Sequence, residues 1–107
     1  MRFDLSRNVA VGVANLAEAE EFYTRVMGWE VQERGPRWVG LSSGAVTIYL
    51  CDDNDGTCFD VPVENAPAAL AYLTSNGCTK VREINGEIFV RDPYGMEYCL
   101  SQGGFEP

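Results

Sequence analysis

The most constraining feature of the sequence is an internal repeat with a period of fifty residues. The segment VGVANLAEAEEFYTRVMGWEV, which begins at Val11, aligns without gaps with VPVENAPAALAYLTSNGCTKV, which begins at Val61. Six of the twenty-one positions are identical, at 11/61, 13/63, 15/65, 19/69, 24/74 and 31/81. Turn residues recur in the same order, with Gly35-Pro36 aligned to Asn85-Gly86. This shared order of apolar segments and turns indicates a duplicated structural unit.

Each half of the repeat contains the signals of one helix after an alternating apolar strand. Asn15 and Asn65 precede the helical segments, and asparagine is a favoured N-cap because its side chain accepts a hydrogen bond from a free backbone N–H. Gly28 and Gly77 are predicted to end the helices, since glycine adopts the left-handed conformation at low cost. The first helix is expected to run to about Met27.

After each helix come three short apolar segments separated by turn residues, which predicts three strands. Asn85-Gly86 is typical of a two-residue hairpin turn between two of them. The chain is therefore predicted to be a single α+β domain over residues 1–107, built from two tandem βαβββ modules at 8–52 and 57–101. We expect a curved mixed sheet around a cleft, with the helices on its outer face.

Composition excludes several classes of function. The chain has no histidine, so it cannot form a Ser-His-Asp triad or a histidine-based metal site. Its net charge of −8 disfavours binding to nucleic acid or to anionic lipid, and no apolar segment is long enough to span a membrane. The four cysteines do not form a CxxC pair, so we interpret them as reduced thiols of a cytoplasmic protein.

Two segments carry a resemblance to a known superfamily. NVAVGVANLAEAEEFYTRVMGWEV, from Asn8, resembles the opening strand and helix of the vicinal oxygen chelate superfamily, and DPYGMEYCL, from Asp92, resembles its closing Asp-Pro-Asp-Gly strand. The superfamily includes glyoxalases, extradiol dioxygenases and bleomycin-resistance proteins. The resemblance extends from about Asn8 to Leu100 and implies the paired-module fold. It also implies a homodimer, which is common in the superfamily.

The resemblance places the superfamily's metal ligands on the first and last strands of each half. The corresponding positions here are Asn8, Tyr49, Cys58 and Cys99, where relatives usually have His, Glu or Gln. An amide and a phenol are poor ligands at neutral pH, and two thiolates alone leave a tetrahedral site incomplete. We therefore expect no metal and no cofactor. A soft-metal site completed by Asp60 or Glu97 is the alternative.

Strand alternation divides the residues between two faces of the sheet. Apolar residues such as Val11, Leu50, Val61 and Leu100 are predicted to face the helices. The opposite face carries small residues, thiols, a phenol and two acids, and none of the residues assigned to it from these strands is a base. We predict that it lines a ligand pocket. The predicted ligand-binding residues are Asn8, Trp38, Tyr49, Cys58, Asp60, Glu97 and Cys99.

An acidic pocket with an aromatic wall favours a cation that carries apolar surface. The leading hypothesis is a non-catalytic protein of the bleomycin-resistance type that sequesters a cationic, partly aromatic drug or toxin and so confers antibiotic resistance. The rival is a lyase, isomerase or dioxygenase-type enzyme that uses Cys58, Cys99, Asp60 and Glu97, with or without a metal. A third possibility is a dimeric scaffold whose cleft has lost its ligand.

The two acids also have a structural alternative. Asp60 or Glu97 could form an ion pair with Arg91 or Arg37 instead of meeting a ligand. Under the ligand-binding hypothesis, Glu97→Gln or Asp60→Asn should weaken cation binding and leave the fold intact. Trp38 has an alternative role as well, as an aromatic cover over the core.

Overall fold

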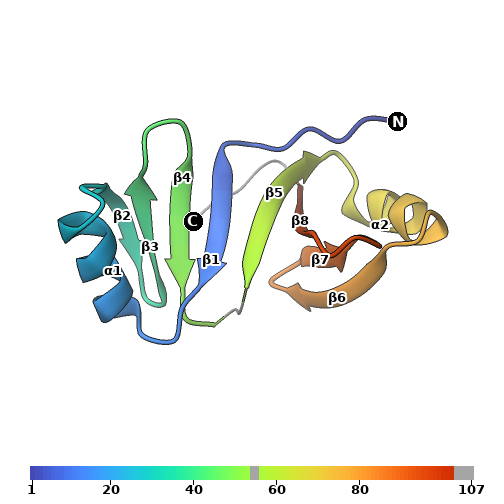
Figure 1. Ribbon diagram of the computed structural model, residues 1–107. Helices are drawn as coiled ribbons and strands as arrows, with labels where there is room; N and C mark the ends of the chain where they lie inside the picture. The colour runs from blue at the N-terminus through green and yellow to red at the C-terminus, as the bar shows by residue number, and fades with distance from the viewer. Residues whose placement is uncertain (54–55, 103–107) are drawn as a thin grey trace. The chain divides into compact units, whose positions relative to one another are not determined.

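The computed structural model describes residues 1–53 and 56–102. The chain folds as two compact units. Of the described residues, the N-terminal module comprises 7–53 and 56–57, and the C-terminal module comprises 58–102 together with the segment Met1–Ser6. Each module contributes four strands and one helix, which makes the described chain a mixed α+β protein (Figure 1).

The N-terminal module is a four-stranded sheet with the order β2-β3-β4-β1. Strands β1 and β4 are parallel, and the β2–β3 and β3–β4 pairs are antiparallel. The elements, in chain order, are β1 (Asn8–Gly12), α1 (Leu16–Arg25), β2 (Glu30–Gly35), β3 (Trp38–Ser42) and β4 (Thr47–Cys51).

The C-terminal module repeats this topology with the strand order β5-β8-β7-β6. Here β5 and β8 are parallel, and the other two pairs are antiparallel. The elements are β5 (Thr57–Val63), α2 (Ala66–Ser75), β6 (Thr79–Ile84), β7 (Glu87–Arg91) and β8 (Glu97–Gln102).

The sequence repeat is also a repeat of strand register. Asn8 pairs with Thr47 in the first module, and Cys58 pairs with Glu97 in the second, so both partners are displaced by fifty residues. The offset falls to forty-nine at the hairpin turns, which lie at 36–37 and 85–86. The alignment of Gly35-Pro36 with Asn85-Gly86 was therefore wrong by one residue. The cause is a helix-to-strand connection that is one residue shorter in the second module.

Both predicted helix starts are confirmed. Asn15 Oδ1 accepts a hydrogen bond from the Glu18 backbone N–H at 3.0 Å, and Asn65 Oδ1 accepts one from Ala68 at 2.9 Å. The first helix ends at Arg25, two residues before the expected end, and Gly28 follows with φ +74°. These caps satisfy donors that a helix leaves free at its N-terminus.

Each module has its own apolar core between its helix and one face of its sheet. Leu50 and Leu100, which are fifty residues apart, are both fully buried at the centres of these cores. Val11 packs in the first core and Val61 in the second, as the alternation predicted. Across residues 1–53 and 56–102, no helix has the length and apolar character needed to cross a membrane.

Candidate ligand-binding site

The sheet face of the N-terminal module that points away from α1, here called its open face, carries an aromatic pair. Val39 and Leu41 pack in the core, so Trp38 between the turn and Val39 points to the other side. Tyr49 lies on the same side, and the ring centroids of Trp38 and Tyr49 are 5.8 Å apart with an interplanar angle of 57°. The structure therefore places these two predicted site residues together.

Two glycines make room for these rings. Trp38 pairs with Gly35 across β2 and β3, and Tyr49 pairs with Gly40 across β3 and β4. A Cβ atom on Gly35 would lie 1.9 Å from Trp38 Nε1, and one on Gly40 would lie 3.0 Å from Tyr49 Cε1. Each ring therefore lies across the glycine of the neighbouring strand, an arrangement that shields backbone with an aromatic face.

Gly35→Ala is expected to displace the Trp38 indole, because the new methyl group would occupy the position of the ring. Overpacking of this kind costs about 1–3 kcal/mol. The measurement is the emission spectrum of Trp38 in a Trp29→Phe background, since Trp29 is the other tryptophan. Gly40→Ala is the matched control and should shift the spectrum much less. An unchanged spectrum in Gly35→Ala would contradict this packing.

Two carboxylates share the open face with the aromatic pair. Glu33 pairs with Gly40, which pairs with Tyr49, so Glu33 lies in the same cross-strand row as the tyrosine. Glu30 begins the row that contains Ser42. Glu30 and Glu33 are exposed. Within the described residues, the arginines of this module that form ion pairs do so with Glu20, Glu21 and Asp52.

Glu33 was not among the predicted site residues, because no face was assigned to residues 30–35 from the sequence. The β2–β3 register also shifts between Val31 and Glu33. Simple alternation along β2 fails at such a bulge, which inserts one residue on one strand. Counting backward from the hairpin turn at 36–37 would have placed Glu33 on the same face as Gly40. Asn8 lies farther along this face and pairs with Thr47.

The other four predicted site residues lie together in the C-terminal module. In the parallel pair β5–β8, Cys58 is opposite Glu97, and Asp60 is opposite Cys99. All four are buried, with relative exposures between 1% and 7%. Their side chains are on the sheet face that points away from α2, since Val61 and Leu100 pack in the core.

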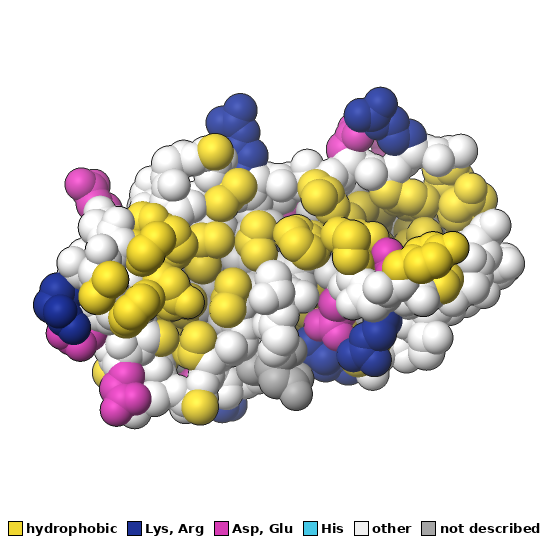
Figure 2. All heavy atoms as spheres, in the orientation of Figure 1, with side chains coloured by type: hydrophobic (Ala, Val, Ile, Leu, Met, Phe, Trp, Pro, Cys, Tyr) yellow, Lys and Arg dark blue, Asp and Glu magenta, His cyan; other side chains and the backbone are white. Residues whose placement is uncertain are grey.

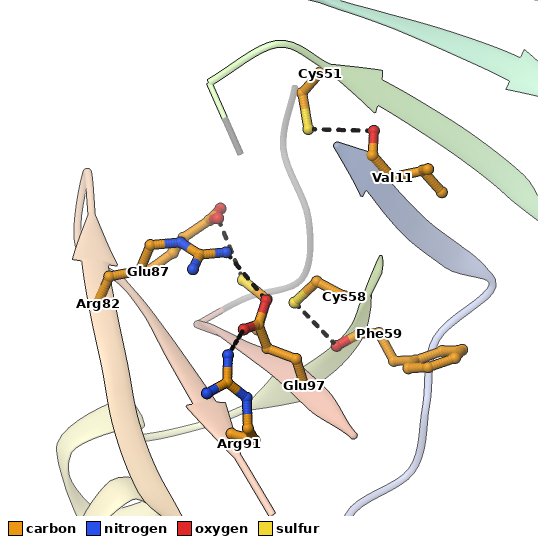
Figure 3. A network of polar contacts seen from close by, with 9 residues as sticks. Val11, Cys51, Cys58, Phe59, Arg82, Glu87, Arg91 and Glu97 are labelled. Carbon is orange, nitrogen blue, oxygen red and sulfur yellow. Dashed lines mark hydrogen bonds and ion pairs between the residues drawn. The ribbon is translucent and has the colours of Figure 1, made fainter. Parts of the chain in front are cut away.

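Glu97 is bound by two arginines (Figure 3). Its Oε2 accepts from Arg82 Nη2 at 3.0 Å, and its Oε1 accepts from Arg91 Nη2 at 3.3 Å. The Arg82 guanidinium also lies 4.6 Å from the centroid of the Phe89 ring. The expectation of an acidic face without a base is therefore wrong in this module. The alternative pairing of Glu97 with Arg91 is confirmed, whereas Arg37 pairs with Asp52.

Asp60 is held by two hydroxyl groups. Ser6 Oγ donates to Asp60 Oδ2 and Ser101 Oγ donates to Oδ1, both at 2.6 Å. The Ser6 backbone N–H donates to the Asp60 carbonyl at 2.9 Å. The carboxylate therefore anchors the N-terminal segment to β5. Within residues 1–53 and 56–102, Arg37 and Arg91 form their ion pairs with Asp52 and Glu97, so neither pairs with Asp60 as the alternative proposed.

Cys99 donates a hydrogen bond from its Sγ to Glu87 Oε2 at 3.3 Å. Burial, followed by the negative charge of Glu87, raises the pKa of the Cys99 thiol far above its ordinary range. The thiol therefore stays protonated, and a protonated thiol is a poor nucleophile and a poor metal ligand.

The donor set does not fit the metal that the superfamily resemblance implies. A metal at the corresponding positions needs deprotonated thiols and available carboxylates. Here the Glu97 carboxylate forms ion pairs with Arg82 and Arg91, and the Asp60 carboxylate accepts hydrogen bonds from Ser6 and Ser101. In the part of the chain that the structure describes, no three or more His, Cys, Asp or Glu side chains are grouped to hold an ion.

Comparison with known proteins identifies the family. The family model described as "Glyoxalase-like domain" matches residues 8–101, so the chain belongs to this family and to the vicinal oxygen chelate superfamily. The comparison with curated protein sequences found no match.

Several solved structures share the fold. A glyoxalase/bleomycin resistance protein/dioxygenase superfamily member from Vibrio splendidus 12B01 is 16% identical, with a TM-score of 0.67, and covers 95% of this chain and 100% of its own. A methylmalonyl-CoA epimerase from Streptomyces coelicolor, in complex with 2-nitronate-propionyl-CoA, is 18% identical with a TM-score of 0.61, covering 92% and 98%. At these identities the likeness establishes the fold alone.

Proposed function

We propose that this protein is a non-catalytic binder that sequesters a small cationic, partly aromatic compound, such as a drug or toxin. The observation that carries the proposal is the partly exposed Trp38 indole packed against the buried Tyr49 ring, with Glu33 in the same cross-strand row as Tyr49. Asn8 lies on the same face of this module. The sequence predicted that Asp60 and Glu97 attract the cationic ligand. We now propose that Glu33 and Glu30 do so instead.

The chemistry of this surface favours a flat cation over a neutral or anionic compound. An aromatic face attracts a cation by about 0.5–2 kcal/mol per contact, and it also buries apolar ligand surface. An exposed carboxylate adds a smaller attraction that salt weakens. The net charge of −8 raises the local concentration of cations in the same direction.

The buried network of the C-terminal module supports the non-catalytic part of the proposal. A general base must be within reach of a substrate proton, and a nucleophilic thiol must ionise. The Cys99 thiol stays protonated beside Glu87, so it is a poor nucleophile. Both carboxylate oxygens of Glu97 accept hydrogen bonds from arginines, so Glu97 is not available as a general base. An enzyme based on Cys58, Cys99, Asp60 and Glu97 would first have to break these contacts.

Two further parts of the proposal concern the setting of the protein. We propose that it works in the cytoplasm, where its four cysteine thiols would stay reduced. We also propose that it forms a homodimer, by analogy with members of its superfamily.

Binding is tested by calorimetric titration with a tricyclic acridinium dye and with 9-anthracenecarboxylate, which has a similar ring system and the opposite charge. We expect only the cation to bind. Trp38→Ala should weaken the affinity at least tenfold, a loss of about 1.4 kcal/mol. Glu33→Gln should weaken it by about threefold at low salt, and the difference should shrink as salt is added.

Glu64→Gln is the control for Glu33→Gln, because it removes one exposed charge from the C-terminal module. It should leave the affinity within a factor of about two. Equal affinity of the parent protein and Trp38→Ala would refute the proposed site. Chemical conversion of the dye during incubation, with or without added divalent metal ions, would refute the non-catalytic role.

A further inference from the structure

The C-terminal module contains a cavity of about 200 Å³ on the helix side of its sheet. This is the side opposite Asp60 and Glu97, so the cavity is separate from the buried polar network. Val61 and Leu100 form its floor, Leu73 of α2 forms a wall, and Phe3 and Leu5 of the N-terminal segment contribute to its lining. Figure 2 shows hydrophobic side chains gathered in the region that lies between β5 and α2 in Figure 1.

The cavity has the size for a fragment and not for a tricyclic dye. An apolar cavity of about 150 Å³ inside a protein binds benzene, whereas pockets for drug-sized ligands begin at about 300 Å³. A volume of about 200 Å³ therefore accommodates one six-membered ring with a short tail.

One end of the cavity is polar and presents hydrogen-bond acceptors. Tyr98 Oη donates its proton to Asp92 Oδ2 at 2.6 Å, so the phenol oxygen can only accept from a ligand. Asp92 Oδ1 accepts from the backbone N–H groups of Tyr94 and Met96. These bonds lower the pKa of Asp92, the Tyr98 hydroxyl having the largest effect, so the carboxylate is charged at neutral pH.

Among the residues that the structure describes, no lysine or arginine lines the cavity. Cys78, also at the lining, has a raised pKa because burial and Asp92 disfavour its thiolate, so it adds no charge. An acceptor-rich end with one negative charge is complementary to an ammonium group. It is less complementary to a hydroxyl group and repels a carboxylate.

The N-terminal segment contributes two apolar side chains, Phe3 and Leu5, to the lining of this cavity. Leu5 is half exposed although it lines the cavity, and the Phe3 ring packs against Tyr72 of α2 with a centroid distance of 5.8 Å. The segment is tied to β5 through Ser6 and Asp60.

We propose that this cavity is a second binding site, specific for a small primary amine with an apolar body of about one ring. The amine lies against Asp92 and Tyr98, and the ring lies among Val61, Leu73 and Leu100. This site is independent of the Trp38–Tyr49 pair and goes beyond the proposed function.

The test uses phenethylamine, 2-phenylethanol and phenylacetate, which share one body and differ in the polar group. Thermal shift and two-dimensional NMR are recorded on the full chain at ligand concentrations up to about 10 mM. We expect stabilisation in the order amine, alcohol, acid, with NMR shifts centred on Leu73, Tyr98 and Leu100. Absence of any shift with the amine at the highest concentration would overturn the proposal.

Variants separate this site from the aromatic pair. Leu73→Phe fills the cavity and should weaken the amine at least tenfold, and Asp92→Asn should weaken the amine about tenfold but the alcohol less than twofold. Trp38→Ala should leave the phenethylamine-induced NMR shifts of Leu73, Tyr98 and Leu100 unchanged, even if the amine also binds at the aromatic pair. Should Leu73→Phe not fold, Tyr98→Phe replaces it with the same expected direction. Amine binding that depends on Trp38 and not on Leu73 would overturn the cavity proposal while supporting the proposed function.

Discussion

Glu97→Gln is expected to lower the free energy of unfolding by about 3 kcal/mol, because it leaves the largely buried Arg82 guanidinium facing a neutral amide. Arg91 adds little to this cost, since its side chain is 56% exposed and stays hydrated. The Glu97 side chain is 8% exposed and that of Arg82 is 24% exposed. Removing one partner of a buried ion pair costs more than the pair itself contributes, since the remaining charge stays desolvated. This expectation reverses the prediction from sequence, in which Glu97→Gln left the fold intact.

The loss is measured by urea unfolding at neutral pH. Glu83→Gln is the matched control, because Glu83 forms an ion pair with Lys80 in which both side chains are nearly half exposed. Exposed pairs contribute about 0–1 kcal/mol, so the control should unfold close to the parent protein. A similar small effect for both variants would show that the Glu97 network contributes little to stability.

A double-mutant cycle with Arg82→Met identifies the source of the loss. If the cost comes from an unpaired guanidinium, removing that guanidinium should restore part of the stability of Glu97→Gln. The coupling free energy is then expected to be about 1–3 kcal/mol. At a temperature where Glu97→Gln is folded, acridinium binding should equal that of the parent protein, since the proposed site is in the other module.

The fold could be predicted from the sequence because its signals are local and occur twice. Asparagine N-caps and alternating strands mark each module, and the fifty-residue period then assigns strands to equivalent places. Asn65 and Asn15 act as expected even though the two helices share few residues. The hairpin alignment was wrong by one residue because the helix-to-strand connection is one residue shorter in the second module, and loops tolerate such changes of length.

The candidate site could be predicted only in part. Strand alternation predicts on which face of the sheet a side chain lies, but not which other side chains it contacts. It placed Trp38 on the same face as Tyr49, and Asp60 on the same face as Glu97, and the structure adds that the Trp38 and Tyr49 rings are in contact. Glu33 and Arg82 lie on β2 and β6, to which no face was assigned from the sequence. The register of β2 shifts between Val31 and Glu33, and that of β6 shifts between Lys80 and Arg82. Alternation alone is a poor guide in such strands, because a bulge interrupts it.

Leu100→Ala and Leu50→Ala are each expected to destabilise their own module by about 3–4 kcal/mol. Both leucines are fully buried, and truncating such a residue loses apolar burial and leaves a cavity. Amide hydrogen exchange resolves the two effects by module, with faster exchange expected in β8 for Leu100→Ala and in β4 for Leu50→Ala. Cost below about 1 kcal/mol for either variant would contradict the tight packing of that core.

Leu100 and Leu50 differ in their relation to the cavity, so the two variants can test whether the amine binds there. Leu100 lines the 200 Å³ cavity, whereas Leu50 lies in the core of the other module. Leu100→Ala therefore enlarges an existing ligand cavity, and a bulkier amine such as 2-(4-methylphenyl)ethylamine should restore part of the lost stability. Leu50→Ala should gain nothing from the same amine beyond the shift seen in the parent protein. Equal rescue of both variants would mean that the amine acts elsewhere, because a ligand stabilises only the folded unit that it binds.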